Sequence, residues 1–494
     1  MSNLNSLIDW YSWGQEALNI AKQENKAIFL LINSNTCNGC YMMQNESFNN
    51  ENIAKILNDN FISLLVDKDE RPDIEKYYQD VYQLMNGKVG GLPLNIFLTA
   101  ECKPFYSTTY IPTIDKNGMM GFENLLSTII SKYKKDFNTL ENEADKILSF
   151  INKDNQKIQA TKLDKSIIKT LSIQIKTLFD SKNGGFGTSP KFPHTSTLDL
   201  MLDLYETNKN SDMLEKVEFT LESMIKGGFY DKSKGGFYRY SKDESWLIPS
   251  LEKTLYDNAL LSELFLRTYN ITKKSIYKEI GFKTIDFIIE NMSKDGLFYC
   301  SSNEYDKEIS INKRVIVADS SMMIKTLFYA SEIDNKYSPL AIKSLENLVK
   351  LTIVDGVMYH SSYINDKPQV KAFFDDYAYL GEALIQAYNT TKDDEYLKDA
   401  VQLLNSAIEQ YYNGGQWIFT SSNSNFKTKA DISDITYPSS VATMVLFILN
   451  ISKMHDEVYK KFAFRTLEIN SYKLMRQPIS MPKLSKAMIE YLQK

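Results

Sequence analysis

The chain has 494 residues and a mass of 56.9 kDa, which is too long for one compact core and predicts two or three domains. Hydrophobic residues make up 43% and charged residues 24%, and these ordinary proportions exclude disorder or a collagen-like repeat as the main organisation. With a formal net charge of −5 and no dense run of Lys and Arg, neither nucleic acid nor an anionic membrane is expected as the main partner.

The first residues, MSNLNSLIDWYSW, lack the basic and apolar segments of a secretory signal peptide. The sequence contains no run of about 18 apolar residues, so it predicts no membrane-spanning helix. Four cysteines are too few for the disulfide framework of a small secreted protein. We therefore expect a reducing, cytoplasmic compartment, in which a Cys-x-x-Cys pair indicates redox or metal chemistry before a structural bridge.

The first 120 residues alternate between helix and strand patterns. Residues 27–33 (AIFLLIN) form a continuous apolar run between polar residues, which is typical of a buried strand. The predicted order is helix 14–25, strand 27–33, a helix opened by CNGCYMMQNESF, helix 51–59, strand 61–67, helix 73–86, strand 94–98 and a hairpin partner at 103–110. This order predicts an α/β domain with a Cys-x-x-Cys sequence directly after its first central strand.

The Cys-x-x-Cys sequence is Cys37-Asn38-Gly39-Cys40. A turn from strand to helix puts Cys37 at a helix N-terminus, where the helix dipole and free N–H groups favour the thiolate. Cys40 lies one turn further on, close enough to resolve a mixed disulfide. We therefore assign Cys37 as the nucleophile and Cys40 as the resolving cysteine. Pro93, in Gly-Gly-Leu-Pro before a strand, is the candidate cis-proline beside the sulfurs.

Two other interpretations of the cysteine pair stay open. It can be an unreactive vestige of the fold. A zinc site is the weaker alternative, because one Cys-x-x-Cys supplies two ligands and structural zinc takes four. We expect no metal and no cofactor.

Several segments resemble a family of large proteins that includes the spermatogenesis-associated thioredoxin-like proteins. They are IDWYSWGQEAL, AIFLLINSNTCNGCYMM, VDKDERPDIEKYYQ, GGLPLNIFLT, GGFGTSPKFPH, GGFYRYSKDESWLIPSLEKTLYDNALL and FFDDYAYLGEAL. The resemblance implies a thioredoxin-like N-terminal domain followed by an (α/α)6 toroid similar to N-acylglucosamine 2-epimerases and six-hairpin glycosidases. The chain departs from the family's Cys-His-Trp-Cys-His sequence, because both histidines are missing. It also has Leu92, Ser250 and Ala318-Asp319 where the family has Trp, His and Trp-Asn.

The remaining sequence contains a repeat of about sixty residues. Turn glycines followed by hydrophobic or aromatic residues recur at Gly185, Gly236, Gly296, Gly356 and Gly415, in steps of 51, 60, 60 and 59. Between them, amphipathic patterns predict twelve helices, at 163–179, 195–208, 211–227, 251–271, 275–292, 318–333, 336–353, 373–391, 394–412, 437–452, 455–470 and 483–493. The predicted organisation is an α/β thioredoxin-like domain at 1–135, a helical bridge at 136–160 and an all-α (α/α)6 toroid at 161–494, with an open helical solenoid as the alternative to the closed ring.

Long loops precede every second predicted helix, so these loops and the N-termini of those helices fall at one end of the ring. Positive helix ends that converge on one face favour an anionic or polyhydroxyl ligand. On this face we place Lys191, His194, Arg239, Trp246, Glu252, Tyr256, Asp257, Asp319, Asp375, Asp376, Tyr377, Asp434 and Tyr437.

Each group in this list has a structural alternative. The aspartates can be helix caps and first-turn acids, and His194 is more simply a hydrogen-bonded structural histidine than a catalytic one. Sugar hydrolysis requires two carboxylates about 5–10 Å apart with one raised pKa. An epimerase would need histidine pairs, and with His360 in a loop of unknown direction the sequence does not favour one. The acidic run 67–75 is either a solvated loop and helix start or part of an interdomain surface.

Three functions compete. The first is a thiol–disulfide oxidoreductase domain fused to a toroid that binds a small polyhydroxyl ligand or a partner, with a thiol- or disulfide-bearing protein as substrate. The second is a carbohydrate-active hydrolase or isomerase in the toroid, with a purely structural first domain. The third is a non-enzymatic redox-sensing or interaction scaffold. The retained cysteines favour the first narrowly over the third, and the second comes behind both.

Overall fold

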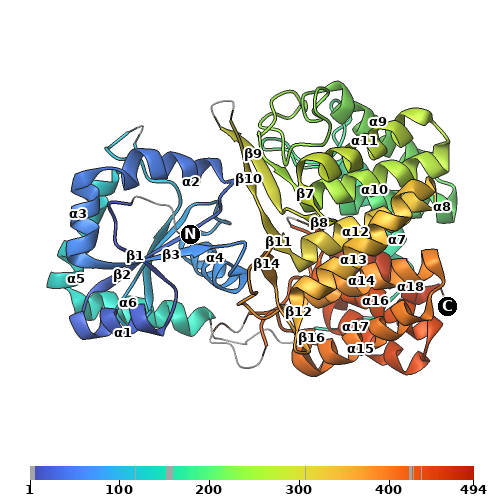
Figure 1. Cartoon of the computed structure of the whole chain (residues 1–494). Helices are drawn as coiled ribbons and strands as arrows, with labels where there is room; N and C mark the ends of the chain where they lie inside the picture. Colours follow the sequence, from blue (N-terminus) through green and yellow to red (C-terminus); the bar gives the residue numbers. More distant parts are fainter. Residues whose placement is uncertain are drawn as a thin grey trace. The chain divides into compact units, whose positions relative to one another are not determined.

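The computed structural model describes residues 6–116, 118–151, 159–305, 308–421, 426, 428–435 and 437–493. The chain divides into two compact units (Figure 1), which we call unit 1 (Met1–Gln156) and unit 2 (Lys157–Lys494). In the described part of the chain no helix is both long and apolar enough to cross a membrane.

Unit 1 is built on a five-stranded mixed sheet with the order β1-β3-β2-β4-β5. The central strand β2 is parallel to β3, with Phe29 opposite Ser63, and antiparallel to β4. Strands β2, β3 and β4 were predicted with the observed bounds, whereas β1 was missed because its three residues carry no strand pattern. The bounds are β1 Trp10–Ser12, β2 Ala27–Asn33, β3 Phe61–Asp67, β4 Leu94–Leu98 and β5 Pro104–Thr108.

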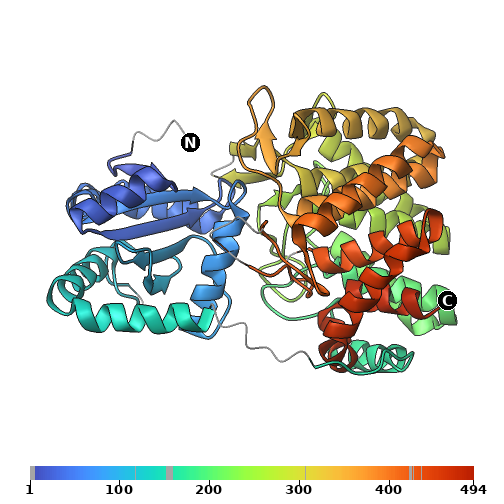
Figure 2. The same cartoon turned by 90° about the horizontal axis from the view of Figure 1, so that it is seen from below.

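Helices cover both faces of this sheet (Figure 2). Side chains alternate along β2, so Phe29 and Leu31 join one core with residues of α2, α3 and α5, while Ile28 and Leu30 point to the opposite face. The helices are α1 Gln15–Glu24, α2 Asn38–Met43, the π-helical turn η1 Gln44–Phe48, α3 Glu51–Asn60, α4 Pro72–Asn86, α5 Phe122–Lys135 and α6 Phe137–Ile151.

The sequence assigned residues 136–160 to a separate bridge, and the structure differs there. Helix α6 contacts β5, α4 and α5, so it is part of unit 1. Leu140 and Ala144 are buried and form an apolar face of α6, which the sheet and α4 cover. This apolar face explains why α6 packs on unit 1. Residues 152–158 of the predicted bridge lie outside the described residues.

Unit 2 contains twelve α-helices in its described residues, in the predicted order. Several of them begin later than predicted, including α7 at Ile167 rather than 163 and α17 at Lys460 rather than 455. Helix α10 begins at Leu255 rather than 251 because Lys253–Thr254 form strand β6, and α16 begins at Ser440 rather than 437. The bounds are α7 Ile167–Leu178, α8 Thr195–Asn208, α9 Ser211–Lys226, α10 Leu255–Thr272, α11 Ser275–Asn291, α12 Val317–Ser331, α13 Ser338–Thr352, α14 Phe374–Thr391, α15 Asp394–Tyr411, α16 Ser440–Met454, α17 Lys460–Arg476 and α18 Pro482–Leu492.

Every second helix belongs to an inner ring. Helices α8, α10, α12, α14, α16 and α18 each contact the next one, and α18 contacts α8, which closes the ring. The other helices pack outside against their inner neighbours, as α11 does on α10 and α15 on α14. The closing contact rules out the open solenoid, since in a solenoid the first and last inner helices stay apart.

The recurring glycines are the turns of short hairpins at the ends of outer helices. Strands β7 (Ser293–Lys294) and β8 (Leu297–Phe298) flank Asp295-Gly296, and equivalent strand pairs flank Gly356 and Gly415. These glycines have φ between 75° and 103°, which explains why glycine recurs there. The sequence did not predict the ribbon of β9 (Ser301–Tyr305) and β10 (Glu308–Asn312), nor the pairing of β11 (Arg314–Ile316) with β14 (Ser361–Tyr363).

Candidate functional site

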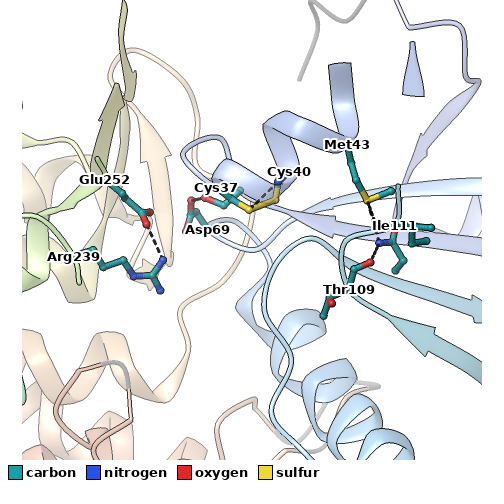
Figure 3. Close-up of a disulfide and its surroundings, with 10 residues drawn as sticks. Cys37, Cys40, Met43, Asp69, Thr109, Ile111, Arg239 and Glu252 are labelled. Atoms are coloured by element: carbon teal, nitrogen blue, oxygen red, sulfur yellow. Dashed lines mark hydrogen bonds and ion pairs between the residues drawn. A yellow bond between two sulfur atoms is a disulfide. The ribbon is translucent and has the colours of Figure 1, made fainter. Parts of the chain in front are cut away.

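The cysteine pair lies where strand β2 turns into helix α2. Cys37 is the N-cap of α2, and its Sγ accepts a hydrogen bond from the backbone N–H of Cys40 at 3.1 Å. The two sulfurs form a disulfide (Figure 3). Cys37 is half-buried while Cys40 is only 8% exposed, so Cys37 is the more exposed residue of the pair.

A loop containing a cis-proline packs against this turn. The Leu92–Pro93 peptide bond is cis, as the sequence predicted. At Gly39, between the two cysteines, an added Cβ would lie 3.0 Å from the carbonyl oxygen of Leu92 and 3.1 Å from Cδ of Pro93. Gly39 therefore allows the cysteine turn to approach the cis-proline closely.

Carboxylates at and just after the end of β3 lie beside the turn between β2 and α2. The Ser34 hydroxyl donates to Oδ2 of Asp69 at 3.0 Å, and the Nζ atom of Lys68 lies 2.9 Å from Oδ1 of Asp69. Asp67, Asp69 and Asp73 are all buried, so the interpretation of residues 67–75 as a solvated loop is wrong at these positions. Because β2 and β3 are parallel neighbours, the residues that follow them meet at one edge of the sheet.

A first group of polar residues in unit 2 surrounds the N-terminus of α10. The Arg239 guanidinium lies 2.9 Å from Glu252, and the Thr254 hydroxyl donates to Asp257 at 2.6 Å. Figure 3 shows the Arg239–Glu252 pair. Burial raises the pKa of Asp257 to about 7, although the Thr254 hydrogen bond and Arg239 oppose the rise. Asp257 therefore titrates near neutral pH.

A second group lies at the N-terminus of α14. Nδ1 of His360 lies 2.9 Å from Oδ2 of Asp376, which is fully buried and also accepts from the backbone N–H of Phe373 at 2.8 Å. Burial opposes the positive charge on His360, but the Asp376 carboxylate outweighs it and raises the pKa of this histidine. The nearby Asp319 acts in the same direction and Arg314 against it.

Tyr437 connects the two groups. Its hydroxyl lies 3.2 Å from Oδ2 of Asp375, and its ring centroid is 5.3 Å from that of Tyr256. Burial and then the charge of Asp375 raise the pKa of Tyr437 well above its usual range, and the Asp319 charge adds to this. The structure thus gathers Arg239, Glu252, Tyr256, Asp257, Asp319, Asp375, Asp376 and Tyr437 at one end of the inner ring, together with His360.

Three residues predicted for this pocket lie elsewhere. Lys191 is fully buried, where its ammonium pairs with Asp180 at 2.6 Å. Trp246 has no exposed surface, and its indole N–H donates to the carbonyl of Asn183 at 3.1 Å, so it is a core residue rather than part of the pocket. Tyr377 points to the outer helix, because its hydroxyl accepts from Gln410 of α15 at 3.0 Å.

Two further predicted residues have structural positions near the inner helices. His194 is the exposed N-cap residue of α8 in a left-handed conformation, and its ring packs edge-on against Phe186. Asp434 accepts from the backbone N–H groups of Ser439 and Lys483, so it ties the loop before α16 to the start of α18. Burial raises the pKa of Asp434 to about 6, although both N–H groups lower it.

Sequence reasoning left His360 undecided and missed a charge network inside the ring. The loop position of His360 was known, but its direction depends on contacts far along the chain, such as its carbonyl accepting from Val317 N–H. The network lines the inner helices α8, α10, α12, α14 and α18, and it consists of Asp199, Asp203, Glu206, Glu263, Arg267, Lys325, Glu382, Lys483 and Lys486. Within the described residues no group of three His, Cys, Asp or Glu side chains is arranged to hold a metal ion.

Comparisons with known proteins confirm the resemblance that the sequence segments indicated. Residues 1–152 match the family model Thioredox_DsbH, described as a protein of unknown function, DUF255. An uncharacterized protein of Caenorhabditis elegans is 28% identical over 614 aligned residues, covering 99% of this chain and 84% of that protein. Spermatogenesis-associated protein 20 of Rattus norvegicus is 34% identical over 305 residues, covering 60% of this chain and 38% of the rat protein.

Solved structures similar to unit 2 share its fold. A D-mannose isomerase matches with a TM-score of 0.54 and 12% identity, covering 68% of this chain and 99% of that chain. A GH76 α-mannanase of Bacteroides thetaiotaomicron matches with a TM-score of 0.52 and 14% identity, covering 67% and 97%. At these identities the likeness concerns the fold alone, and it fits the (α/α)6 toroid that the repeat predicted.

Proposed function

We propose that unit 1 is a thioredoxin-like domain and acts as a thiol–disulfide oxidoreductase through Cys37 and Cys40. The observation that carries the proposal is the disulfide across the first turn of α2, with Cys37 the more exposed cysteine. The cis peptide bond before Pro93, packed against Gly39, and the thioredoxin-type family model for residues 1–152 support it.

The reaction is a thiol–disulfide exchange between the reduced cysteine pair and a partner disulfide, and it needs no cofactor. In the reduced chain the Cys37 thiolate attacks one sulfur of a partner disulfide and releases the other partner sulfur as a thiolate. The Cys40 thiolate then attacks Sγ of Cys37, which reforms the Cys37–Cys40 disulfide and releases the partner in its dithiol form. The partner class is therefore a disulfide-bearing protein, and a reducing compartment such as the cytoplasm supplies electrons for the next cycle.

The test is the pH dependence of Cys37 alkylation in the reduced protein, measured by mass spectrometry in a Cys40→Ser background. We expect a thiol pKa below 8, because Cys37 lies at a helix N-terminus. Burial raises the pKa of Cys102 to about 11, so the Cys102 thiol adds little to alkylation near neutral pH. Cys102→Ser is the control. A Cys37 pKa near the ordinary value of about 8.5 would remove the chemical basis of the proposal.

The second part of the proposal is that the toroid binds a polyhydroxyl ligand at the inner-helix N-termini. Carboxylates, an arginine and the rings of Tyr256 and Tyr437 converge there, and such groups bind hydroxyls and sugar faces. Two structural neighbours of unit 2 are enzymes named for mannose or a mannan. Saturation-transfer NMR with a panel of sugars tests this, and contact signals that Arg239→Met abolishes would support it.

A redox-sensing scaffold without turnover is the competing function. It is favoured by the loss of both histidines around the cysteines, at Asn38 and Tyr41. In that case oxidation of Cys37 and Cys40 changes partner binding while no disulfide exchange occurs. Turnover of a model disulfide by the wild-type chain, lost in Cys37→Ser, separates the two functions.

A further inference from the structure

A polar cavity opens at the other end of the inner ring, away from the polar groups around Asp257. Its walls are the C-terminal ends of three inner helices, with Tyr205 and Glu206 from α8, Asn270 from α10 and Tyr329 from α12. Asp257 is in the first turn of α10, and about 20 Å of helix separate it from Asn270. The cavity is therefore distinct from the site described above.

The cavity has the size of a small metabolite. Its volume is about 220 Å³, which is below the roughly 300–1,000 Å³ of pockets for drug-sized ligands. At about 30 Å³ for each water it holds the equivalent of about seven water molecules, so a ligand of about ten non-hydrogen atoms fits it. The lining residues Glu206, Lys209 and Asn270 are exposed, and the cavity is therefore open to solvent.

Arg267 forms one wall of the cavity, and its charge is already matched. Its guanidinium pairs with Asp199 and lies 2.8 Å from Asp203 and 3.0 Å from Glu206. The Nζ atom of Lys486 lies 2.8 Å and 2.9 Å from the same two aspartates. Two cations therefore face three carboxylates here, and a purely anionic ligand would find no excess of positive charge.

Glu206 and Lys209 bring opposite charges to the cavity without neutralising each other. They are three positions apart at the end of α8, a spacing at which such side chains can pair. Glu206 instead accepts from Arg267 through Oε2, and the Lys209 ammonium lies over the Tyr205 ring, 5.5 Å from its centroid. Lys209 has no carboxylate partner among the residues that the structure describes. A carboxylate on a ligand can therefore pair with it without breaking an existing ion pair.

Other groups of the cavity favour an ammonium. Asn270 donates from Nδ2 to the Tyr329 hydroxyl at 3.0 Å, and none of the described residues donates to its Oδ1. Glu206 is half-exposed and uses one oxygen for Arg267. The ends of α8, α10 and α12 add the negative poles of three helix dipoles. A ligand that carried only a positive charge would nevertheless be repelled by Arg267 and Lys209.

We propose that this cavity binds a free α-amino acid with an apolar side chain. The carboxylate of the ligand pairs with the Lys209 ammonium, and its ammonium donates to Glu206 and to Oδ1 of Asn270. The side chain packs on Ile271 and on the ring of Tyr329, which also line the cavity. The inference is independent of the cysteine chemistry and of polyhydroxyl binding, because it uses none of their residues.

The test is isothermal titration calorimetry on the full chain with L-valine, L-leucine, L-methionine and L-phenylalanine. We expect at least one of them to bind with a Kd below about 1 mM. Two analogues of the bound amino acid, each lacking one charge, are titrated next; for leucine they are 3-methylbutylamine and 4-methylpentanoate. Each should bind at least about tenfold more weakly, because it loses a charge-assisted hydrogen bond.

Variants assign the two charges. Lys209→Met and Glu206→Gln should each weaken binding of the amino acid at least about tenfold. Lys209→Met should not weaken binding of the amine analogue, which has no carboxylate, whereas a merely structural role of Lys209 would affect both ligands. Lys273→Met is the matched control and should bind as wild type does. Lys273 is the C-cap of α10 and also lies 5.5 Å from a tyrosine ring centroid, that of Tyr269, but it does not line the cavity.

Three results would overturn the proposal. The first is no binding of any of the four amino acids at about 10 mM. The second is an analogue with one charge that binds as tightly as the amino acid, because the paired charges would then have no role. The third is unchanged binding in Lys209→Met, which would place the ligand elsewhere on the chain. If Glu206→Gln fails to fold because Arg267 loses a partner, Lys209→Met decides, since no ion pair of the described residues depends on Lys209.

Discussion

Replacing Asp257 by Asn should remove a pH-dependent destabilisation of unit 2. Asp257 is 5% exposed, and burial raises its pKa from the ordinary 3.8 to about 7. The folded chain therefore binds this proton more tightly than the unfolded chain does between these pH values. A carboxyl group of this kind lowers the free energy of unfolding as pH rises through that window.

The magnitude follows from the two pKa values. The difference between about 7 and 3.8 corresponds to about 4 kcal/mol, absent below pH 3.8 and complete above pH 7. Asn is isosteric, keeps an oxygen that accepts from Thr254, and cannot ionise. At pH 5 the penalty amounts to about 1.7 kcal/mol, and at pH 8.5 it amounts to about 4 kcal/mol. We expect Asp257→Asn to be more stable than wild type by these amounts at the two pH values.

The assay is denaturant unfolding at pH 5 and pH 8.5, followed by fluorescence of Trp246 and Trp417, which are buried in unit 2. His360, whose pKa is raised, also gives stability that is lost with rising pH, but it is present in both proteins and cancels in the difference. Parallel pH profiles for wild type and variant would refute the reasoning, because they would mean that Asp257 is ionised at no cost in the folded chain.

Two further predictions concern the packing of the ring. Arg267→Met should destabilise unit 2 by about 3 kcal/mol, because Arg267 neutralises Asp199, Asp203 and Glu206 inside the ring. The control is Lys283→Met, which breaks an exposed ion pair with Glu279, and its free energy of unfolding should match that of wild type. Gly381→Ala should cost about 1–3 kcal/mol, since the new Cβ would lie 2.2 Å from the Phe447 ring where α14 meets α16. Gly91→Ala, with no atom within 4 Å of its Cβ, should leave the melting temperature unchanged, and equal effects of the two alanines would contradict the packing argument.

The parts of the fold that local sequence determines were predictable. Strands β2, β3 and β4 are continuous apolar runs between turns, and their bounds follow from that pattern. The sixty-residue period follows from hairpin turns in which glycines such as Gly296 and Gly356 take positive φ. Strand β1 depends instead on its partner, since Trp10–Ser12 become a strand only by pairing with Ser63–Leu65.

The candidate site was predictable in position but not in composition. The alternation of long loops and helices placed first-turn residues such as Asp257 and Asp376 at one end of the ring. The same reasoning wrongly included Lys191, because its burial depends on Asp180, eleven positions earlier, and on the Trp246 ring. It left His360 undecided, because a loop residue's direction is set by long-range hydrogen bonds such as that from His360 N–H to the carbonyl of Val370.

Asp376 shows why helix capping and chemistry are not alternatives at this end of the ring. Its carboxylate accepts from Phe373 N–H and so satisfies a free donor at the start of α14, which is a capping role. The same two oxygens hold Nδ1 of His360, which a cap alone does not require. An acid placed at a helix start for stability is thus already positioned to orient a neighbouring histidine. The inner helices present such starts side by side, so a few changes in the preceding loops are enough to give this fold a different chemistry.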